Sequence, residues 1–479
     1  MDRASEKIFQ YKDSNEIAII DSEHNSITYT ELYASCVKLA NTLEERNCSQ
    51  NVMVYTGNSI EYVVALLALW MTDRTAVLIE IKTIQDDICR LFDYFKSDTI
   101  ILSSLTQIEN TVCPKVIVPD LKGDFELSDW KDKPFTNNIA MIFQTSGTTF
   151  EPKHVMISHS GIIAECNAST KLHGFERNVR DLLVVPITSS FGTCGLLLPN
   201  LYVGRSISLY QGEFNVKKVR KFIRETNTTL VVCTFSILSL IIGNEKEENS
   251  DFKSVKYVAL AGEVSNTNVF ERTKKVFGVD YIVQLYGLTE TSGLLAGNCI
   301  DKKAPFQSVG KVLNNFKIRI KDGENIKGTN ELGEIQVKGE SVTCGYYEND
   351  ELNKNSFDNE WFKTGDIGYI DDEGYLYIKG RIKNIIIVGG KNVYAEEVEK
   401  IVMMNENVKL ANVYAQKSKI TGEKVICEVL LNENCEVSSK DLLIYCKNKM
   451  KNYMVPSEFK FVDRQIINTS GKAARKSWK

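Results

Sequence analysis

The chain has 479 residues, of which 43% are hydrophobic and 25% are charged, and its formal net charge is −4 at pH 7. This is the composition of a soluble globular protein, and the length predicts roughly two to four lobes that need no disulfide or metal for stability. The small net charge and the lack of a long basic stripe argue against a nucleic acid as the main partner. The N-terminus is charged, and the longest apolar run, residues 63–71, is too short to cross a membrane. We therefore expect a cytoplasmic protein with no membrane partner.

The N-terminal half of the chain alternates between helical and strand patterns. Thr28 followed by Glu31 forms a capping-box pattern, which predicts a helix that begins at residue 28, and residues 59–70 predict a second helix. Short runs rich in Val, Ile and Leu are the strand candidates: residues 52–55, 75–79, 139–143, 181–185, 206–209, 230–233 and 255–260. Because helical stretches separate most of these runs, the pattern predicts βαβ units and largely parallel sheets.

The pattern changes after Gly310. Residues 317–320, 333–338 and 374–379 alternate apolar and polar side chains between Gly-rich turns, which predicts antiparallel hairpins that form a small barrel. Roughly the last 100 residues predict a separate α+β lobe. Its expected elements are helices at 395–403 and 438–451, the second opened by Ser438 with Asp441, and strands at 411–416, 425–431 and 459–462.

The segment with the clearest chemical pattern is residues 144–153, Gln-Thr-Ser-Gly-Thr-Thr-Phe-Glu-Pro-Lys, which follows the strand candidate at 139–143. Its hydroxyls, its backbone N–H groups and the cation of Lys153 suit the binding of phosphate oxygens. It is not the Walker pattern, because no Gly-Lys-Ser/Thr closes it. The alternative interpretation is a Ser/Thr-rich surface turn.

Two further segments each carry a carboxylate that could contact a bound nucleotide or its metal ion. Tyr286-Gly-Leu-Thr-Glu-Thr291 follows a strand candidate at 281–285, where α/β sheets bind ligands, and Glu290 offers hard oxygen ligands to Mg²⁺. Residues 361–368 present Asp366, an acceptor that suits two ribose hydroxyls. Taken singly, each segment favours the ordinary interpretation: a loop with a solvated glutamate for the first, and an aspartate that ends a strand or forms an Asx-turn for the second.

The final two segments are basic. Residues 380–394 combine Arg381 and Lys383 with a Gly389–Gly390 loop, a pattern typical of an interdomain hinge or of a plain linker and strand. Residues 468–472, Asn-Thr-Ser-Gly-Lys, present a lysine on a short loop close to the C-terminus. The alternative for that lysine is a frayed basic tail.

In this order and at this spacing, the five segments resemble the adenylate-forming superfamily of acyl-CoA synthetases, adenylation domains of nonribosomal peptide synthetases and firefly luciferase. The likeness covers nearly the whole chain and includes Gly345-Tyr346. It implies a large N-terminal adenylation core at 1–380 and a small mobile C-terminal domain at 381–479. The implied reaction uses ATP and Mg²⁺ to convert a carboxylic acid to its acyl-adenylate, and then passes the acyl group to a thiol.

The resemblance also implies roles for individual residues. The β- and γ-phosphates of ATP would be bound by Thr145, Ser146, Gly147, Thr148, Thr149 and Lys153. The adenine would be contacted by Gly262, Glu263 and Tyr286. Thr289 would contact the α-phosphate and Glu290 would bind Mg²⁺, whereas Asp366 and Arg381 would hold the ribose. Lys472 would bridge the substrate carboxylate and the α-phosphate. Lys383 would be the hinge between the two domains.

The chain also departs from the family pattern. Phe150 stands where the family usually has glycine, and His154 stands where a small residue is common. Where amino-acid-activating domains carry an aspartate for the substrate ammonium, this chain has Gly192. Because an unpaired buried ammonium is costly, we expect a neutral aliphatic, hydroxy or aryl acid. The expected pocket residues are Ser189, Ser190, Thr234, Ser236, Leu294 and Leu295.

The sequence leaves the acceptor open between coenzyme A and the phosphopantetheine of a carrier protein. A second hypothesis is an enzyme that stops at the adenylate or passes it to a nitrogen or oxygen acceptor. A third is a degenerate family member that binds a nucleotide or a partner without catalysis. Phe150 favours the third, whereas the presence of Lys472, Glu290, Asp366 and Arg381 argues against it.

Overall fold

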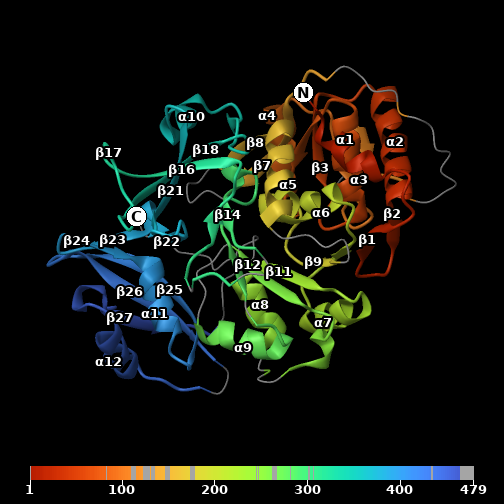
Figure 1. Cartoon of the computed structure of the whole chain (residues 1–479). Helices are drawn as coiled ribbons and strands as arrows, with labels where there is room; N and C mark the ends of the chain where they lie inside the picture. The colour runs from red at the N-terminus through yellow and green to blue at the C-terminus, as the bar shows by residue number, and fades with distance from the viewer. Residues whose placement is uncertain are drawn as a thin grey trace.

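The computed structural model describes residues 2–81, 83–108, 115–121, 130, 135–145, 152–172, 179–243, 245, 248–261, 267–280, 282–299, 303–305, 307–432 and 435–463. Figure 1 shows two sheet-and-helix units and an antiparallel region, with the C-terminal elements, in blue, gathered to one side. Within the described ranges, the helices are all too short or too polar to span a bilayer.

The first large sheet has seven strands in the order β19-β8-β7-β4-β3-β5-β6. Its strands are β3 (Asn51–Tyr55), β4 (Thr75–Leu78), β5 (Thr99–Leu102), β6 (Lys115–Ile117), β7 (Ile139–Thr145), β8 (Lys153–Ser158) and β19 (Gly345–Tyr346). Strands β3 to β7 run parallel, whereas β8 is antiparallel to both β7 and β19. Val54 packs into the main core and Met53 into a second core on the opposite face. Burial of both faces explains the nearly continuous apolar runs that predicted these strands.

The second large sheet also has seven strands, in the order β13-β12-β11-β9-β10-β1-β2. They are β1 (Ile17–Asp21), β2 (Ser26–Thr28), β9 (Asp181–Leu183), β10 (Ile207–Leu209), β11 (Leu230–Thr234), β12 (Tyr257–Ala261) and β13 (Val283–Leu285). All of its pairings are parallel except β1 with β2. The predicted parallel sheets are therefore confirmed, although several strands are shorter than the apolar runs that predicted them.

Helices cover these two sheets. They are α1 (Ala4–Ile8), α2 (Tyr29–Glu45), α3 (Ile60–Met71), α4 (Gln85–Phe95), α5 (His159–Leu172), α6 (Leu198–Tyr202), α7 (Val216–Glu225), α8 (Phe235–Ile242) and α9 (Thr267–Phe277). The capping box before α2 is confirmed, because the Thr28 hydroxyl accepts from the Glu31 N–H at 3.2 Å and a Glu31 carboxylate oxygen accepts from the Thr28 N–H at 2.8 Å. Every residue of α3 is buried, so this apolar helix is a core element rather than a membrane segment.

The region after Gly310 is antiparallel, as predicted. The segment that we expected to form a small barrel forms a six-stranded sheet. In this sheet β21 pairs with β18, β20 and β22. Its elements, with a neighbouring two-stranded sheet and a short helix, are β14 (Ala296–Gly297), β15 (Lys311–Val312), β16 (Phe316–Asp322), β17 (Asn325–Ile326), β18 (Gly333–Gly339), α10 (Asp350–Ser356), β20 (Phe357–Asp358), β21 (Trp361–Ile370) and β22 (Leu376–Arg381).

The C-terminal elements have a hydrophobic core of their own. They are β23 (Ile385–Val388), β24 (Lys391–Tyr394), α11 (Ala395–Met403), β25 (Val408–Ser418), β26 (Gly422–Leu431), α12 (Ser439–Lys449) and β27 (Glu458–Phe461). Their core begins at Ile386, whereas the buried residues of the main core end at Leu376. The predicted helix start at Ser438 is confirmed, with a capping box to Asp441.

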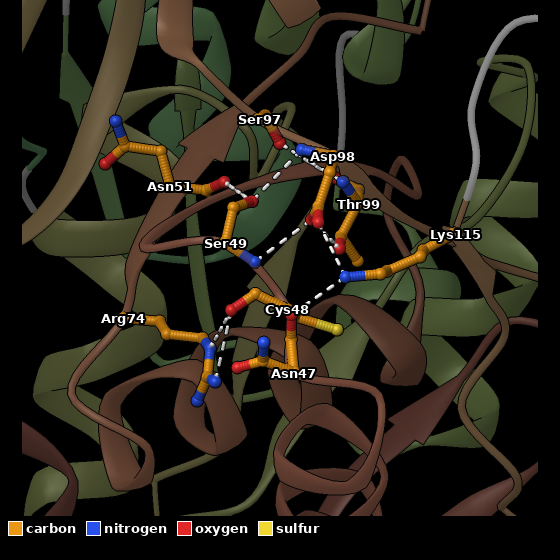
Figure 2. A network of polar contacts seen from close by, with 9 residues as sticks. All are labelled: Asn47, Cys48, Ser49, Asn51, Arg74, Ser97, Asp98, Thr99 and Lys115. Atoms are coloured by element: carbon orange, nitrogen blue, oxygen red, sulfur yellow. Dashed lines mark hydrogen bonds and ion pairs between the residues drawn. The ribbon is translucent and has the colours of Figure 1, made fainter.

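A polar network ties together the amino ends of β3, β5 and β6 (Figure 2). The Asp98 carboxylate accepts from the Ser49 N–H at 3.0 Å, from the Thr99 hydroxyl at 2.6 Å and from Lys115 Nζ at 2.6 Å. Burial favours the neutral acid, but these donors outweigh it and hold the pKa of Asp98 well below its usual value. The predicted functional loops lie at the opposite, carboxyl ends of strands, so we assign this network to sheet stability.

Candidate active site

The predicted phosphate loop connects β7 to β8. Thr145 and Lys153 face each other across this antiparallel pair, and the Thr145 hydroxyl donates to the Lys153 carbonyl oxygen at 3.4 Å. The two residues therefore form the base of a narrow hairpin that presents the loop. The other residues of the predicted phosphate loop lie outside the described residues: Ser146, Gly147, Thr148, Thr149 and Phe150.

Three predicted nucleoside contacts form one hydrogen-bonded cluster. Asp366 in β21 is opposite Arg381 at the end of β22, and its Oδ1 lies 2.8 Å from Arg381 Nε. The phenol of Tyr286, directly after β13, donates to the other carboxylate oxygen of Asp366 at 2.5 Å. Burial, followed by the charge of Asp366, raises the pKa of Tyr286 well above its usual value, so the phenol keeps its proton and acts as a donor. The structure thus brings together three residues that are far apart in the sequence.

Thr289 and Glu290 lie on a single helical turn, Thr289–Thr291, that follows the same strand. The Ser190 hydroxyl donates to the Thr289 hydroxyl at 3.0 Å, which joins the predicted acyl pocket to the predicted α-phosphate contact. The Thr343 N–H donates to the Glu290 carbonyl oxygen at 2.8 Å, and the Tyr346 phenol donates to Glu290 Oε1 at 2.9 Å. Both the backbone and the side chain of Glu290 are therefore fixed.

Glu290 offers one carboxylate oxygen, Oε2, to Mg²⁺. Among the described residues its Oε2 has no hydrogen-bond or ion-pair partner, and no group of three or more acidic, His or Cys side chains is placed to hold a metal. A site with one available carboxylate oxygen fits Mg²⁺, which usually keeps several waters and takes its other ligands from substrate phosphates.

Two of the residues predicted to form the acyl pocket, Ser189 and Ser190, precede an unusual helical segment. Residues Phe191–Leu197 form a π-helix directly after Ser189 and Ser190, and such segments are frequent at functional sites. A Cβ added at Gly192 would lie 2.3 Å from the Pro186 carbonyl oxygen, so this position has no room for a side chain. The other predicted pocket residues are buried: Thr234, which caps α8, Ser236, Leu294 and Leu295.

The predicted hinge lies between the two hydrophobic cores. Lys383 is exposed in the single turn Ile382–Asn384, and Asn384 Nδ2 donates to Glu396 Oε1 at 2.7 Å. Gly389 and Gly390 have φ of 56° and 77° and are exposed. Lys472, Gly262 and Glu263 lie outside the described residues, so the structure does not place them.

Two residues of the site went unassigned in the sequence. Tyr346 belongs to the family-like Gly-Tyr pair, but nothing in the sequence connects it to Glu290, 56 residues away. Glu165 in α5 is 0% exposed and accepts the Leu294 N–H at 3.2 Å, the Ser169 hydroxyl at 2.8 Å and Asn315 Nδ2 at 3.3 Å. Burial raises the pKa of Glu165 to about 8. Because α5 mixes polar and apolar residues, no signal in the sequence indicated that Glu165 is buried.

Comparison with known proteins agrees with this geometry. Residues 8–347 match the AMP-binding enzyme family, and residues 397–472 match its C-terminal domain. The chain belongs to the AMP-binding enzyme family. The predicted adenylate-forming superfamily and α/β fold are confirmed, and the chain is an AMP-forming acid–thiol ligase.

Individual relatives of this AMP-binding enzyme cover almost its full length. The 2-succinylbenzoate–CoA ligase of Bacillus velezensis is 30% identical over 95% of this chain and 93% of the relative, and that of Bacillus licheniformis is 28% identical over 96% of both. The structure of o-succinylbenzoate CoA synthetase from Bacillus subtilis with its acyl-adenylate intermediate has a TM-score of 0.85 and 25% identity, and covers 99% of this chain and 97% of that one. The same enzyme with ATP and a magnesium ion also gives a TM-score of 0.85, at 25% identity and 98% coverage of both chains.

Proposed function

We propose that this enzyme joins a non-α-amino carboxylic acid to coenzyme A with Mg²⁺ and ATP, and that 2-succinylbenzoate is the first acid to test. The observation that argues against an α-amino acid is made at Gly192. The Pro186 carbonyl oxygen fills the space that an aspartate side chain would need there to pair with the ammonium of the substrate. The names of the relatives support both an aryl acid and coenzyme A as the acceptor.

The residue roles belong to this proposal. Asp366, Arg381 and Tyr286 would hold the ribose and adenine of ATP, and Thr289 would meet the α-phosphate. Thr145, Lys153 and the loop between them would hold the β- and γ-phosphates, and Lys472 would bridge the substrate carboxylate and the α-phosphate. Mg²⁺ held by Glu290 would neutralise phosphate charge.

The proposed chemistry has two steps. First, a carboxylate oxygen of the acid attacks the α-phosphorus of ATP, the bond to the bridging oxygen breaks, and pyrophosphate leaves. Next, the thiolate sulfur of coenzyme A attacks the acyl carbon of the adenylate, and AMP leaves. Because two anions must approach in the first step, the chain's main contribution is the placing of cations and hydrogen-bond donors around the phosphates.

We also propose that residues 381–479 form a mobile domain that turns about Lys383 between the two steps. The separate C-terminal core, which begins at Ile386, supports movement of this part as one body. After the turn, the exposed Gly389–Gly390 loop would line the thiol entrance.

A product assay tests the acceptor. The purified chain is incubated with Mg²⁺, ATP and 2-succinylbenzoate, with either coenzyme A or a phosphopantetheinylated carrier protein, and the products are identified by mass spectrometry. We expect a coenzyme A thioester and one AMP for each thioester formed. Acyl-carrier without acyl-CoA would contradict the proposed acceptor, and AMP release without a thioester in both incubations would contradict thioester formation.

A further inference from the structure

Tyr346 occupies a position between two parts of the proposed ATP site. It belongs to β19, which pairs with β8 so that Tyr346 is opposite Val155, two residues beyond Lys153. Asn353 fixes its backbone: the Tyr346 N–H donates to Asn353 Oδ1 at 2.7 Å, and Asn353 Nδ2 donates to the Tyr346 carbonyl oxygen at 3.1 Å. The side chain is only 2% exposed, so its direction is set by packing.

The hydroxyl and the ring of Tyr346 have different partners. The hydroxyl donates to Glu290 Oε1 at 2.9 Å, and Ser356 also interacts with it. The ring face carries Lys153, whose Nζ lies 5.3 Å from the ring centroid. One side chain therefore contacts both the proposed Mg²⁺ ligand and the proposed phosphate cation.

The bond to Glu290 also fixes which carboxylate oxygen is available. With Oε1 engaged by the phenol, Oε2 is left without a partner among the described residues. Partners of this kind orient a metal ligand and tune its affinity without contacting the metal. A cation over an aromatic ring is likewise held in place by the ring quadrupole.

We propose that Tyr346 is a positioning residue that couples the two halves of the Mg²⁺–ATP site, aiming Glu290 Oε2 at the metal and the Lys153 ammonium at the phosphates. This inference rests on the proposed function, because it takes Glu290 as the Mg²⁺ ligand and Lys153 as a phosphate contact. It adds a residue and two separable tasks: the hydroxyl serves the metal, and the ring serves the lysine.

The two tasks are separated by two substitutions and a binding assay. ATP affinity of the purified chain is measured by calorimetry with excess Mg²⁺ and again with EDTA, for the wild type, Tyr346→Phe and Tyr346→Ala. Tyr346→Phe keeps the ring and removes the hydroxyl. We therefore expect the factor by which Mg²⁺ raises ATP affinity to be about tenfold smaller than in the wild type, while the affinity measured in EDTA stays unchanged. Tyr346→Ala should weaken Mg²⁺-free binding as well, because Lys153 loses its ring.

Two controls distinguish positioning from general damage. Tyr347→Phe makes the same chemical change one residue away, where the ring packs with Tyr94 and Phe95, and should leave both affinities unchanged. Tyr346→Phe should also convert preformed acyl-adenylate and coenzyme A to thioester at the wild-type rate, since that step needs no Mg²⁺–ATP.

The possible contrary results are distinct. A Tyr346→Phe variant with an unchanged Mg²⁺-dependent gain, or with equal losses in Mg²⁺ and in EDTA, would overturn the inference while leaving the proposed function intact. A wild-type chain that binds ATP equally well with Mg²⁺ and with EDTA would overturn both.

Discussion

Arg381 Nε lies 2.8 Å from Asp366 Oδ1, and the two residues face each other across the β21–β22 ladder. The carboxylate is almost fully buried and its second oxygen accepts the Tyr286 phenol, so both of its oxygens are held before any nucleotide arrives. Such preorganisation keeps down the cost of ordering a ligand contact.

Replacing Asp366 should weaken nucleotide binding. Asp366→Ala removes the proposed ribose acceptor and leaves Arg381 and Tyr286 without their shared partner, so we expect ATP affinity to fall about 10- to 100-fold, the equivalent of about one hydrogen bond to a charged group. Tyr286→Phe keeps the Arg381 ion pair and should cost less. Titration of a fluorescent ATP analogue measures both variants. Wild-type affinity in Asp366→Ala would refute the nucleoside site.

The glycine at position 192 should resist conversion to an amino-acid pocket. In Gly192→Asp the Cβ would lie 2.3 Å from the Pro186 carbonyl oxygen, so the backbone must shift. We expect a loss of about 1–3 kcal/mol in the free energy of unfolding, the usual cost of overpacking, and no activation of α-amino acids. Gly195→Ala is the matched control, because its Cβ would meet only side-chain atoms, the nearest at 3.2 Å. A stable Gly192→Asp that activates an α-amino acid would contradict the claim that the Pro186 carbonyl oxygen leaves no room for a counter-ion at position 192.

The hinge proposal predicts unequal effects on the two steps. Proline fixes φ near −65°, which suits the helical turn that holds Lys383 but restricts rotation there. Lys383→Pro should therefore slow thioester formation more than pyrophosphate release, while Lys383→Ala should spare both. The two rates are measured separately in single-turnover experiments. An equal loss of both steps would remove the hinge argument.

Glu165 should make stability depend on pH. Burial raises its folded pKa to about 8 from an ordinary value of 4.5, so the folded chain binds more protons between those values than the unfolded chain does. Stability from this group is then fully present below about pH 4.5 and is lost as pH rises towards 8, by up to a few kcal/mol at about 1.4 kcal/mol per pKa unit. Glu165→Gln, a neutral analogue, should flatten the fall in urea denaturation between these pH values. An unchanged pH slope would show that Glu165 titrates normally.

Local patterns in the sequence were enough to predict many of the strands and four of the helices. The spacing of three residues in Thr28–Glu31 and Ser438–Asp441 located two helix starts, because a capping box forms within a single turn. Helix α11 has the predicted bounds, Ala395–Met403. The order of the motifs identified the superfamily, although the 361–368 motif lies inside β21, a strand that the apolar pattern did not predict.

Contacts between distant segments could not be predicted. Ser190 and Thr289 are 99 residues apart, and Glu165 and Leu294 are 129 apart, so no local pattern joins them. The departure at His154 now has a physical reason: its ring packs 5.0 Å from Tyr94 and 4.9 Å from Phe95, between centroids. Burial lowers the pKa of His154 to about 4, so it is a neutral packing residue next to the phosphate loop.

We would first follow the acid-dependent exchange of labelled pyrophosphate into ATP, without thiol, across a panel of 2-succinylbenzoate, other aryl acids, aliphatic acids and α-amino acids. The proposed function predicts exchange with an aryl or aliphatic acid, none with α-amino acids, and near-complete loss of exchange in Lys472→Ala. Exchange with an α-amino acid, or none with any acid, would contradict the proposed function. The second of these results would favour a nucleotide-binding protein without catalysis, and Phe150→Gly would be the next variant to make.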